Sequence, residues 1–342
     1  MKILVYSPYL DILGGGEQYA FNFAACMAKH HQVYLVWPDK RILIKAAARF
    51  QLNLDSIIVI PFLPPRFHLK QFDLIFFVSD GSIPLLPFGQ SILHFQVPFH
   101  HVSGKSLLNW LKLKFIDHIV CNSHFTKSHI DPEFGVSSQV IYPAVTIRPL
   151  NLPKENLILS VGRFTTTLHH KKQDALIRAF IELESQLPGW ELNLAGGTET
   201  GSETLLRQLQ DQIQGHRIKL LPNITTQVLN QLYAQAKFYW HAAGYEENLT
   251  QSPQKAEHFG ISIVEAMGHG AVPLAFAAGG PQEIITPASG QLWHTLPQLT
   301  DQTLALIKDD HQWQQLSTAA VNRAQFFTVD KFCHEFYDLL QI

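Results

Sequence analysis

Two glutamates eight positions apart carry the strongest chemical signal in this sequence. Glu257 and Glu265 flank an apolar segment that contains Phe259 and Gly260. On one helix, residues at this spacing would point about 80° apart, so a shared helical face does not explain the pair. The pattern instead predicts that Glu257 precedes a helix whose N-terminus lies at residues 259–261, and that Glu265 projects from its second turn.

Such an arrangement offers the groups that bind a phosphorylated sugar. Backbone N–H groups at residues 259–261 suit a phosphate, and the two carboxylates can accept hydrogen bonds from sugar and ribose hydroxyls. A second interpretation stays open, because Ser262 and Glu265 also form a capping-box pattern, in which Glu265 bonds back to the helix N-terminus. The direction of the Glu265 carboxylate separates the two.

Basic residues that could bind a diphosphate follow the strand predicted at residues 156–162. Arg163 comes at the carboxyl end of this strand, and Lys171 and Lys172 stand at the start of the next predicted helix. The fork of an Arg and the point charge of a Lys can bind one diphosphate together. The alternative is a solvated charged loop.

Glycines follow the first strand at residues 14–16 and another strand at Gly196 and Gly197. Such glycines leave backbone N–H groups open to a phosphate or let a flat ring approach the chain. Ordinary tight connections look the same, so the glycines identify no site by themselves.

The elements that must position these residues alternate regularly. Short apolar runs rich in β-branched residues alternate with amphipathic stretches, which predicts βαβ units and parallel sheets. The pattern restarts after a polar, Pro-marked stretch at 148–156, so we expect doubly wound domains at 1–150 and 151–325, with a C-terminal helix within 326–342 packed back on the first domain. Ligands of such sheets bind beyond the carboxyl ends of the strands, which predicts a cleft between the two domains.

Composition narrows the class of protein. The 342 residues suit two domains, and 26 Lys and Arg against 28 Asp and Glu leave no global basic field for nucleic acid. Three widely spaced cysteines predict no disulfide framework and fit a reducing compartment. The 18 His residues show no metal-ligand spacing, so no metal is predicted. No apolar stretch reaches the roughly 18 residues that span a bilayer, so we expect a cytoplasmic protein.

One amphipathic stretch suggests peripheral contact with the inner face of a membrane. In residues 104–115, Leu107, Leu108, Leu111 and Phe115 share one helical face, beside Trp110 and three Lys residues. This pattern is typical of an interfacial helix. The alternative is that the apolar stripe packs on the protein's own sheet.

The ordered motifs resemble the retaining glycosyltransferases of family 4, which have the GT-B fold of two Rossmann-like domains facing a central cleft. The matching segments cover nearly the whole chain: Gly14–Glu17, Cys121–Thr126, Val140–Val145, Val161–Arg163, Lys172, Leu194–Gly197, Glu257–Glu265 and Gly279–Gly280. The phrase from Glu257 to Ile261, Glu-His-Phe-Gly-Ile, is similar to a branch rich in mannosyltransferases.

The resemblance implies transfer of a hexose of the mannose or glucose type, without metal or cofactor. The donor is a GDP- or UDP-linked sugar, and the acceptor is a hydroxyl of a glycan, a lipid-linked or a small molecule. Arg163 and Lys172 match the pair on the donor diphosphate, Glu257 the carboxylate near the sugar, Glu265 the ribose ligand, and His94 a first-domain histidine that reaches the sugar. Further implied donor contacts are Gly15, Gly16, Lys171, Gly197, His258, Phe259, Gly260 and Ile261.

Two departures from the family pattern leave alternatives open. The gap between Arg163 and Lys172 is long, so Lys171 could take the role of Lys172. His94 is also farther from the following proline than usual, and His100 or His101 could replace it.

Two other functions are compatible with the same motifs. A non-catalytic subunit would bind the nucleotide-sugar without turnover. A sugar-nucleotide epimerase on the same fold would need additional acid–base carboxylates, and no such set stands out in the sequence.

Overall fold

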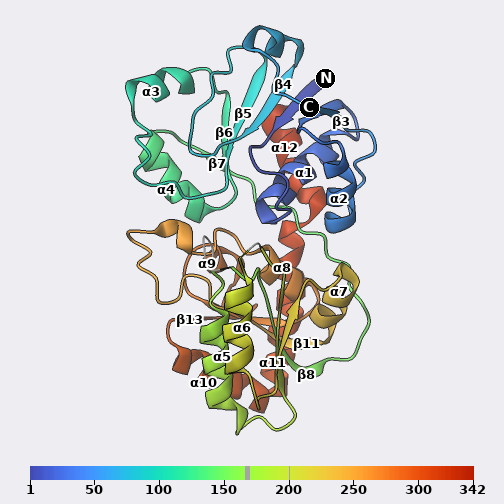
Figure 1. Ribbon diagram of the computed structural model, residues 1–342, viewed down its shortest axis with the longest axis vertical. Helices are drawn as coiled ribbons and strands as arrows, with labels where there is room; N and C mark the ends of the chain where they lie inside the picture. Colours follow the sequence, from blue (N-terminus) through green and yellow to red (C-terminus); the bar gives the residue numbers. More distant parts are fainter. Residues whose placement is uncertain (166–169, 200) are drawn as a thin grey trace. The chain divides into compact units, whose positions relative to one another are not determined.

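The computed structural model describes residues 1–165, 170–199 and 201–342. The chain divides into two compact units. The N-terminal unit comprises residues 1–146 and 327–342, and the C-terminal unit comprises residues 147–326. Each unit is built around its own parallel sheet (Figure 1).

The sheet of the N-terminal unit has the strand order β3-β2-β1-β4-β5-β6-β7, with all neighbours parallel. Its strands are β1 (Lys2–Tyr6), β2 (Gln32–Val36), β3 (Ile58–Ile60), β4 (Leu74–Val78), β5 (Gln90–Phe95), β6 (His118–Cys121) and β7 (Gln139–Val140). Its helices are α1 (Gly15–Met27), α2 (Arg41–Phe50), η1 (Arg66–Gln71), α3 (Leu107–Leu113), α4 (His124–Phe134) and α12 (Val329–Leu340). Every residue of β4 is buried, as expected for a central parallel strand covered on both faces.

The sheet of the C-terminal unit has the order β10-β9-β8-β11-β12-β13 and is also parallel throughout. Its strands are β8 (Glu155–Val161), β9 (Glu191–Gly196), β10 (Ile218–Pro222), β11 (Ala236–His241), β12 (Val272–Phe276) and β13 (Gln291–Trp293). Its helices are α5 (Gln173–Glu184), α6 (Glu203–Gln212), α7 (Thr226–Gln235), η2 (Pro253–Lys255), α8 (Ile261–Gly268), α9 (Pro281–Ile284), α10 (Leu296–Lys308) and α11 (Asp310–Ala324), and η3 (Gln325–Phe327) follows. The predicted α/β class with two doubly wound parallel sheets is confirmed.

Helix α12 belongs to the N-terminal unit although it comes last in the chain. Phe332 packs edge-on against Tyr19 of α1, with ring centroids 5.0 Å apart, and Cys333 forms a disulfide with Cys26. Figure 1 shows α12, in red, beside α1. The disulfide corrects the prediction drawn from widely spaced cysteines, because a separation of 307 residues conceals two helices that pack side by side.

Residues 304–322, whose apolar pattern is that of one helix, are divided between α10 and α11 in the structure. Asp309 ends α10 and then caps α11, since its carboxylate accepts a hydrogen bond of 2.9 Å from the Gln312 backbone. Aspartate is a preferred N-cap because its side chain satisfies an otherwise unpaired N–H group. A periodic apolar pattern runs through both helices and conceals this break.

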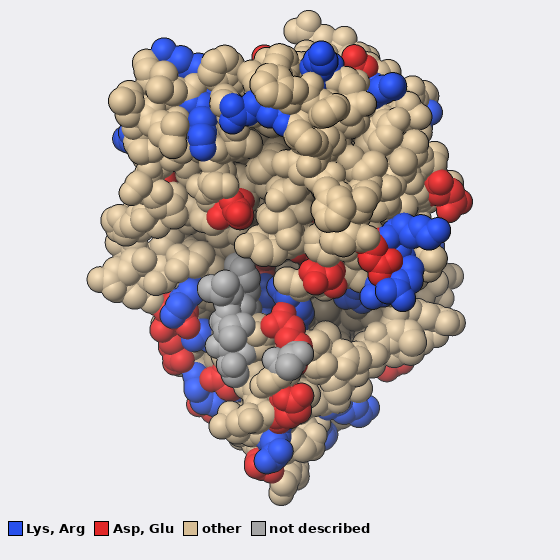
Figure 2. All heavy atoms as spheres, turned by 45° about the horizontal axis from the view of Figure 1, so that its top comes forward, with Lys and Arg blue, Asp and Glu red and all other residues tan. Residues whose placement is uncertain are grey.

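Residues other than Lys, Arg, Asp and Glu make up most of the surface drawn in Figure 2. This agrees with a chain in which only 16% of residues are charged. Basic and acidic side chains are drawn in small groups, some of which contain both signs. The ion pairs of the C-terminal unit include Arg163 with Glu199, Lys171 with Glu257 and Lys172 with Glu247. Across the described residues, no helix has both the length and the apolar character needed to cross a bilayer.

Candidate active site

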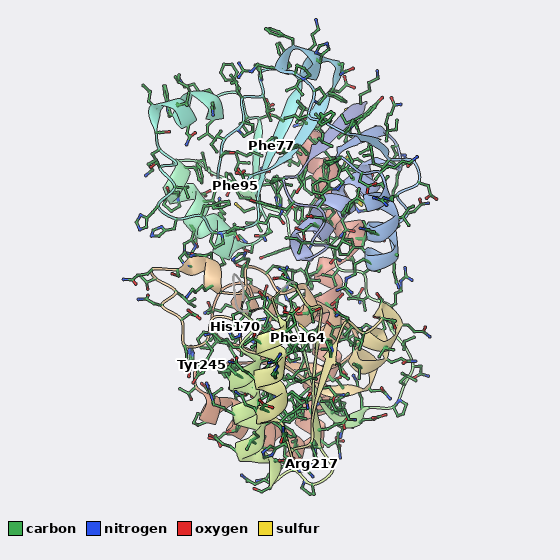
Figure 3. The ribbon with its side chains drawn as sticks, viewed as in Figure 1. Phe77, Phe95, Phe164, His170, Arg217 and Tyr245 are labelled. Carbon is green, nitrogen blue, oxygen red and sulfur yellow. A yellow bond between two sulfur atoms is a disulfide. The ribbon has the colours of Figure 1, made fainter. Side chains whose placement is uncertain are left out.

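The candidate residues of the C-terminal unit lie at the carboxyl ends of its strands. Arg163 and Phe164 follow β8, and Gly197 follows β9. In Figure 3, Phe164, His170 and Tyr245 lie toward one end of the strands, whereas Arg217, which precedes β10, lies at the other. The carboxyl ends of parallel strands are where such sheets bind their ligands.

A buried cluster surrounds Glu257, which lies between η2 and α8. Lys171 Nζ lies 2.5 Å from Glu257 Oε2, and His241 Nε2 lies 3.0 Å from the same oxygen. The carboxylate side chain is 15% exposed. Burial raises the pKa of Glu257, but the Lys171 charge and the His241 contact outweigh it and hold that pKa well below its ordinary value of 4.5.

His241 is a member of this cluster that sequence reasoning missed. It is the last residue of β11 and is almost fully buried, and within the described structure its Nδ1 atom has no hydrogen-bond partner. The available signal was a histidine at the carboxyl end of a predicted strand, which is where such sheets bind their ligands. Because its ring contacts Glu257 rather than solvent, His241 is placed to orient that carboxylate.

Glu257→Gln is expected to destabilise the C-terminal unit by about 3 kcal/mol at neutral pH, because it leaves Lys171 without its buried counter-charge. The lowered pKa of Glu257 means that its contribution is present above about pH 4.5 and is lost as pH falls through the folded-state value. Melting temperatures across this pH range test the prediction, and the gap between wild type and variant should narrow in acid. A gap that stays constant with pH, or equals that of Glu246→Gln in an exposed pair, would contradict it.

Lys172 points to a different carboxylate from Lys171. Its backbone is left-handed, with φ of 54°, at the position that caps α5. Its Nζ lies 2.6 Å from Glu247 Oε1, and Lys255 pairs with the other oxygen of Glu247 at 2.7 Å. Glu247 and Lys255 line an open pocket of about 390 Å³ together with His170 and Asp174. The two adjacent lysines therefore join separate networks.

Lys171 is the lysine that lies against the end of β8, next to Arg163. The stem of Lys171 crosses Gly162, where a Cβ atom would lie only 2.6 Å from Lys171 Cγ. Gln173 also donates a hydrogen bond of 3.1 Å to the Arg163 carbonyl. The Arg163 side chain pairs with Glu199, with Nη1 and Oε1 2.5 Å apart. The end of β8 is thus held against the start of α5. Arg163 supplies a cation next to the strand, and Lys171 supplies one next to the helix.

Helix α8 excludes one of the two interpretations of Glu265, and the ribose contact stays a prediction. The helix begins at Ile261 with Gly260 as its N-cap, so Ser262 lies inside the first turn and the capping-box interpretation is wrong. The Tyr233 hydroxyl donates a 2.9 Å hydrogen bond to Glu265. Tyr239 donates a 2.7 Å hydrogen bond to Ser262. Tyr233 and Tyr239 come from α7 and β11, and the sequence pattern had pointed to neither.

The side chains of residues 258 and 259, which precede α8, are packed inside the C-terminal unit. Phe259 is 3% exposed, and His258 turns into its own loop, where its Nε2 lies 3.0 Å from the Gln254 carbonyl. Gly280 packs on this segment, since a Cβ there would lie 2.2 Å from the Phe259 carbonyl oxygen. The His258 side chain is therefore placed to stabilise this loop, and its donor contact stays a prediction.

Gly196→Ala is expected to destabilise the C-terminal unit by about 2 kcal/mol, because a Cβ at Gly196 would lie 2.0 Å from the Gly162 carbonyl oxygen. Gly197→Ala is the matched control, since the nearest atom there is 4.0 Å away, and it should cost less than about 0.5 kcal/mol. Denaturant unfolding of both variants checks the difference. Equal losses of unfolding free energy in the two variants would show that the close approach to Gly162 is not the reason for a glycine at position 196.

His94 of the N-terminal unit, predicted to reach the donor sugar, is fully buried in the structure. It is the penultimate residue of β5. Its ring stacks on Tyr19 with centroids 3.9 Å apart, and its Nδ1 lies 3.1 Å from the Val120 carbonyl. Burial lowers the pKa of His94 to about 3, so the ring is neutral. The prediction that His94 reaches the sugar is corrected, because the end of this strand faces the core. His100 and His101 lie in the exposed loop that follows.

The glycine loop of the N-terminal unit leads into α1, which begins at Gly15. The Gly14 N–H donates to Glu17 at 2.7 Å, so the helix supplies an acidic partner for its own N-terminus. A Cβ at Gly16 would lie 2.7 Å from the Gln96 side-chain oxygen. Gly16 therefore allows a close approach within this unit, and the donor contact of Gly15 and Gly16 stays a prediction.

Two doubly wound parallel sheets in one chain are the architecture of the GT-B fold, and solved structures of that fold match this chain over its whole length. HepE of Anabaena, crystallised with UDP and glucose, matches with a TM-score of 0.76 and 19% identity, covering 100% of this chain and 99% of that one. Sucrose-phosphate synthase from Thermosynechococcus elongatus matches with a TM-score of 0.71 and 17% identity, covering 99% and 98%. These similarities show the fold.

Sequence similarity shows the family. The model of the family described as "Glycosyl transferases group 1" matches residues 146–322, just over half of the chain, so the protein belongs to this family. The GDP-Man:Man(3)GlcNAc(2)-PP-Dol alpha-1,2-mannosyltransferase of Dictyostelium discoideum is 23% identical over 64% of this chain and 46% of its own length. The Homo sapiens protein of that name is 28% identical over 52% and 37%. The chain therefore spans less than half the length of these relatives.

Proposed function

We propose that the protein is a retaining hexosyltransferase that moves a mannose- or glucose-type sugar from a GDP- or UDP-linked donor to the hydroxyl of a glycan, a lipid-linked or a small-molecule acceptor. The observation that carries the proposal is the buried Lys171, Glu257 and His241 cluster beside the N-terminus of α8. Membership of the glycosyl transferase group 1 family supports it, as do the GDP-Man in the names of the relatives and the UDP and glucose bound by HepE.

In this proposal, Arg163 and Lys171 bind the donor diphosphate from the end of β8 and the start of α5. Lys171 replaces Lys172 in this role, since Lys171 lies beside Gly162 and Lys172 pairs with Glu247. The N-terminal N–H groups of α8 add a second anion-binding element. The position and helix dipole of this backbone suit a phosphate, and neither requires the His258 side chain.

The carboxylates bind hydroxyl groups. Glu257 accepts hydrogen bonds from the donor sugar, and His241 and Lys171 keep it ionised and oriented. Glu265, which already accepts from Tyr233, binds the ribose. A carboxylate held by fixed partners binds hydroxyls without first having to reorganise.

Reaction with retention proceeds by departure of the diphosphate and attack by the acceptor hydroxyl on the same face of the sugar. The bond from the anomeric carbon to the phosphate oxygen breaks, and the acceptor proton leaves with the nucleoside diphosphate. Arg163 and Lys171 stabilise the charge that develops on the leaving group, which is usually the largest catalytic effect. These two cations and the helix terminus supply the positive charge, so the proposal requires no metal and no cofactor.

A panel of GDP- and UDP-sugars tests the function, with release of nucleoside diphosphate as the readout and the anomeric configuration of the product determined by NMR. Donor binding without turnover would indicate a non-catalytic subunit. Conversion of the donor sugar without diphosphate release would indicate an epimerase. Inversion at the anomeric carbon would contradict retention.

Arg163→Ala is expected to lower transfer at least about tenfold, because a guanidinium that binds the leaving diphosphate is lost. Arg217→Ala is the matched control, since Arg217 also pairs with a glutamate, Glu184, but precedes β10 at the opposite edge of the sheet. Initial rates of donor turnover check the pair. Equal losses in the two variants would argue against a site at the carboxyl ends of the strands.

A further inference from the structure

Helix α3 of the N-terminal unit has no buried residue. Leu107 is 73% exposed, Leu108 61% and Trp110 52%, and Leu111 and Phe115 are also exposed. We call these five side chains the α3 patch. Their exposure rules out the alternative that the stripe packs on the protein's own sheet, and in Figure 1 α3 lies away from the strands.

A second exposed apolar segment accompanies the α3 patch. Phe62 is 78% exposed and Phe67 76%, and they lie before and within η1. Leu69 of η1 is buried in the same apolar cluster of the N-terminal unit on which Leu113 of α3 packs. Both segments are therefore anchored to one cluster and turn their remaining apolar side chains outward.

The Lys and Arg charges within these segments are not offset by any Asp or Glu of the same segments. Residues 81–116 contain no Asp or Glu but include Lys105, Lys112 and Lys114, and residues 56–72 contain none but include Arg66 and Lys70. Lys105 and Lys114 are exposed, and the Lys114 Nζ lies 3.6 Å from the centre of the Trp110 ring. A surface that attracts anions thus borders the exposed apolar side chains.

Two acidic residues next to residues 81–116 are hydrogen-bonded through their carboxylates. The Glu133 carboxylate accepts from the backbone N–H groups of Val102 and Gly104, at 3.0 and 3.2 Å. The Asp117 carboxylate accepts from Ser91. The Glu133 carboxylate stabilises the loop before α3, and the Asp117 carboxylate stabilises the start of β5.

We propose that the α3 patch docks this protein on an anionic lipid bilayer, with the five apolar side chains in the headgroup region and Lys105 and Lys114 against lipid phosphates. Aromatic and leucine side chains next to lysines suit this interface, because the apolar part leaves water while the ammonium stays with the headgroups. Each cation near an anionic membrane strengthens binding about fivefold. Deep insertion is not needed for this geometry, since α3 lies on the surface.

This membrane contact goes beyond the proposed transfer reaction and is tested without donor or acceptor. The full chain is floated with vesicles of phosphatidylcholine alone and with vesicles in which about a third of the lipid is phosphatidylglycerol. The wild type should float with the anionic vesicles and about tenfold less with the neutral ones. Failure to float with anionic vesicles would overturn the proposal.

Variants separate the two components of the surface. Leu108→Glu with Leu111→Glu removes apolar contact, and Lys105→Glu with Lys114→Glu reverses the charge; each should lower the bound fraction at least about fivefold. Ile44→Glu, on α2 and 72% exposed, is the control and should bind like the wild type. Unchanged melting temperatures show that the variants fold, and unchanged turnover of a soluble acceptor separates this result from the transfer site.

Other occupants of the patch give distinct results. If the wild type self-associates and the leucine variant is monomeric, the α3 patch is an interface between copies, and the proposal is wrong. Flotation that the α3 variants do not reduce would also overturn it, because binding would then lie elsewhere on the chain.

Discussion

Lys171→Ala is expected to reduce hexose transfer about a hundredfold, whereas Lys172→Ala should reduce it less than about fivefold. The structure distinguishes two residues that are adjacent in the chain. Lys171 lies over Gly162 and pairs with the buried Glu257, while Lys172 turns toward Glu247 in a left-handed backbone conformation. A cation that stabilises the leaving diphosphate acts mainly in the transition state, so the loss should fall on kcat.

The measurement is the initial rate of nucleoside diphosphate release at saturating donor, with melting temperatures as the test of folding. Lys171→Arg is a useful further variant, because it keeps the charge and changes the geometry, and it should retain part of the activity. A larger loss in Lys172→Ala than in Lys171→Ala would reverse the assignment. Near-normal turnover in both variants would remove the lysines from the diphosphate site.

Glu257→Gln should also lower transfer about a hundredfold. The amide has the shape of the carboxylate but no charge, so it cannot balance Lys171 or bind sugar hydroxyls as strongly. Since the pKa of Glu257 lies well below 4.5, the wild-type carboxylate is ionised throughout the neutral range. The loss in the variant should therefore be the same from about pH 6 to pH 8.

Glu247→Gln provides the matched control, because Glu247 is also paired with two lysines, at 2.6 and 2.7 Å, but away from the Glu257 cluster. It should lower transfer less than about fivefold. Rates at several pH values for both variants, with folding monitored in parallel, check the prediction. If the two variants lose the same activity, the effect is one of ion-pair stability and not of sugar binding.

Much of the local architecture around the site could be predicted from the sequence. The strand before Arg163 and the helix that carries Glu265 both show in apolar periodicity, which depends only on neighbours a few residues away. The spacing of the two glutamates around Gly260 predicted that Glu257 precedes the helix and that Glu265 lies in its second turn. The structure shows this arrangement. These features are local, so the sequence pattern contains them.

Long-range partners were not predictable in the same way. Tyr233 donates to Glu265 across 32 positions, and His241 contacts Glu257 across 16. Both come from elements whose apolar pattern indicates a buried face but not which residue lies opposite. Partner choice depends on how strands and helices are stacked, and that information is distributed over the whole unit.

The sequence by itself determined the order of the elements, the parallel sheets and the candidate residues at the strand ends. Only the tertiary structure decided that Lys171 and not Lys172 pairs with Glu257, that His94 is buried, and that the apolar side of α3 is exposed. The reason is physical: backbone periodicity shows which side of an element is apolar, but the neighbour that covers that side, or its absence, follows from packing between distant segments.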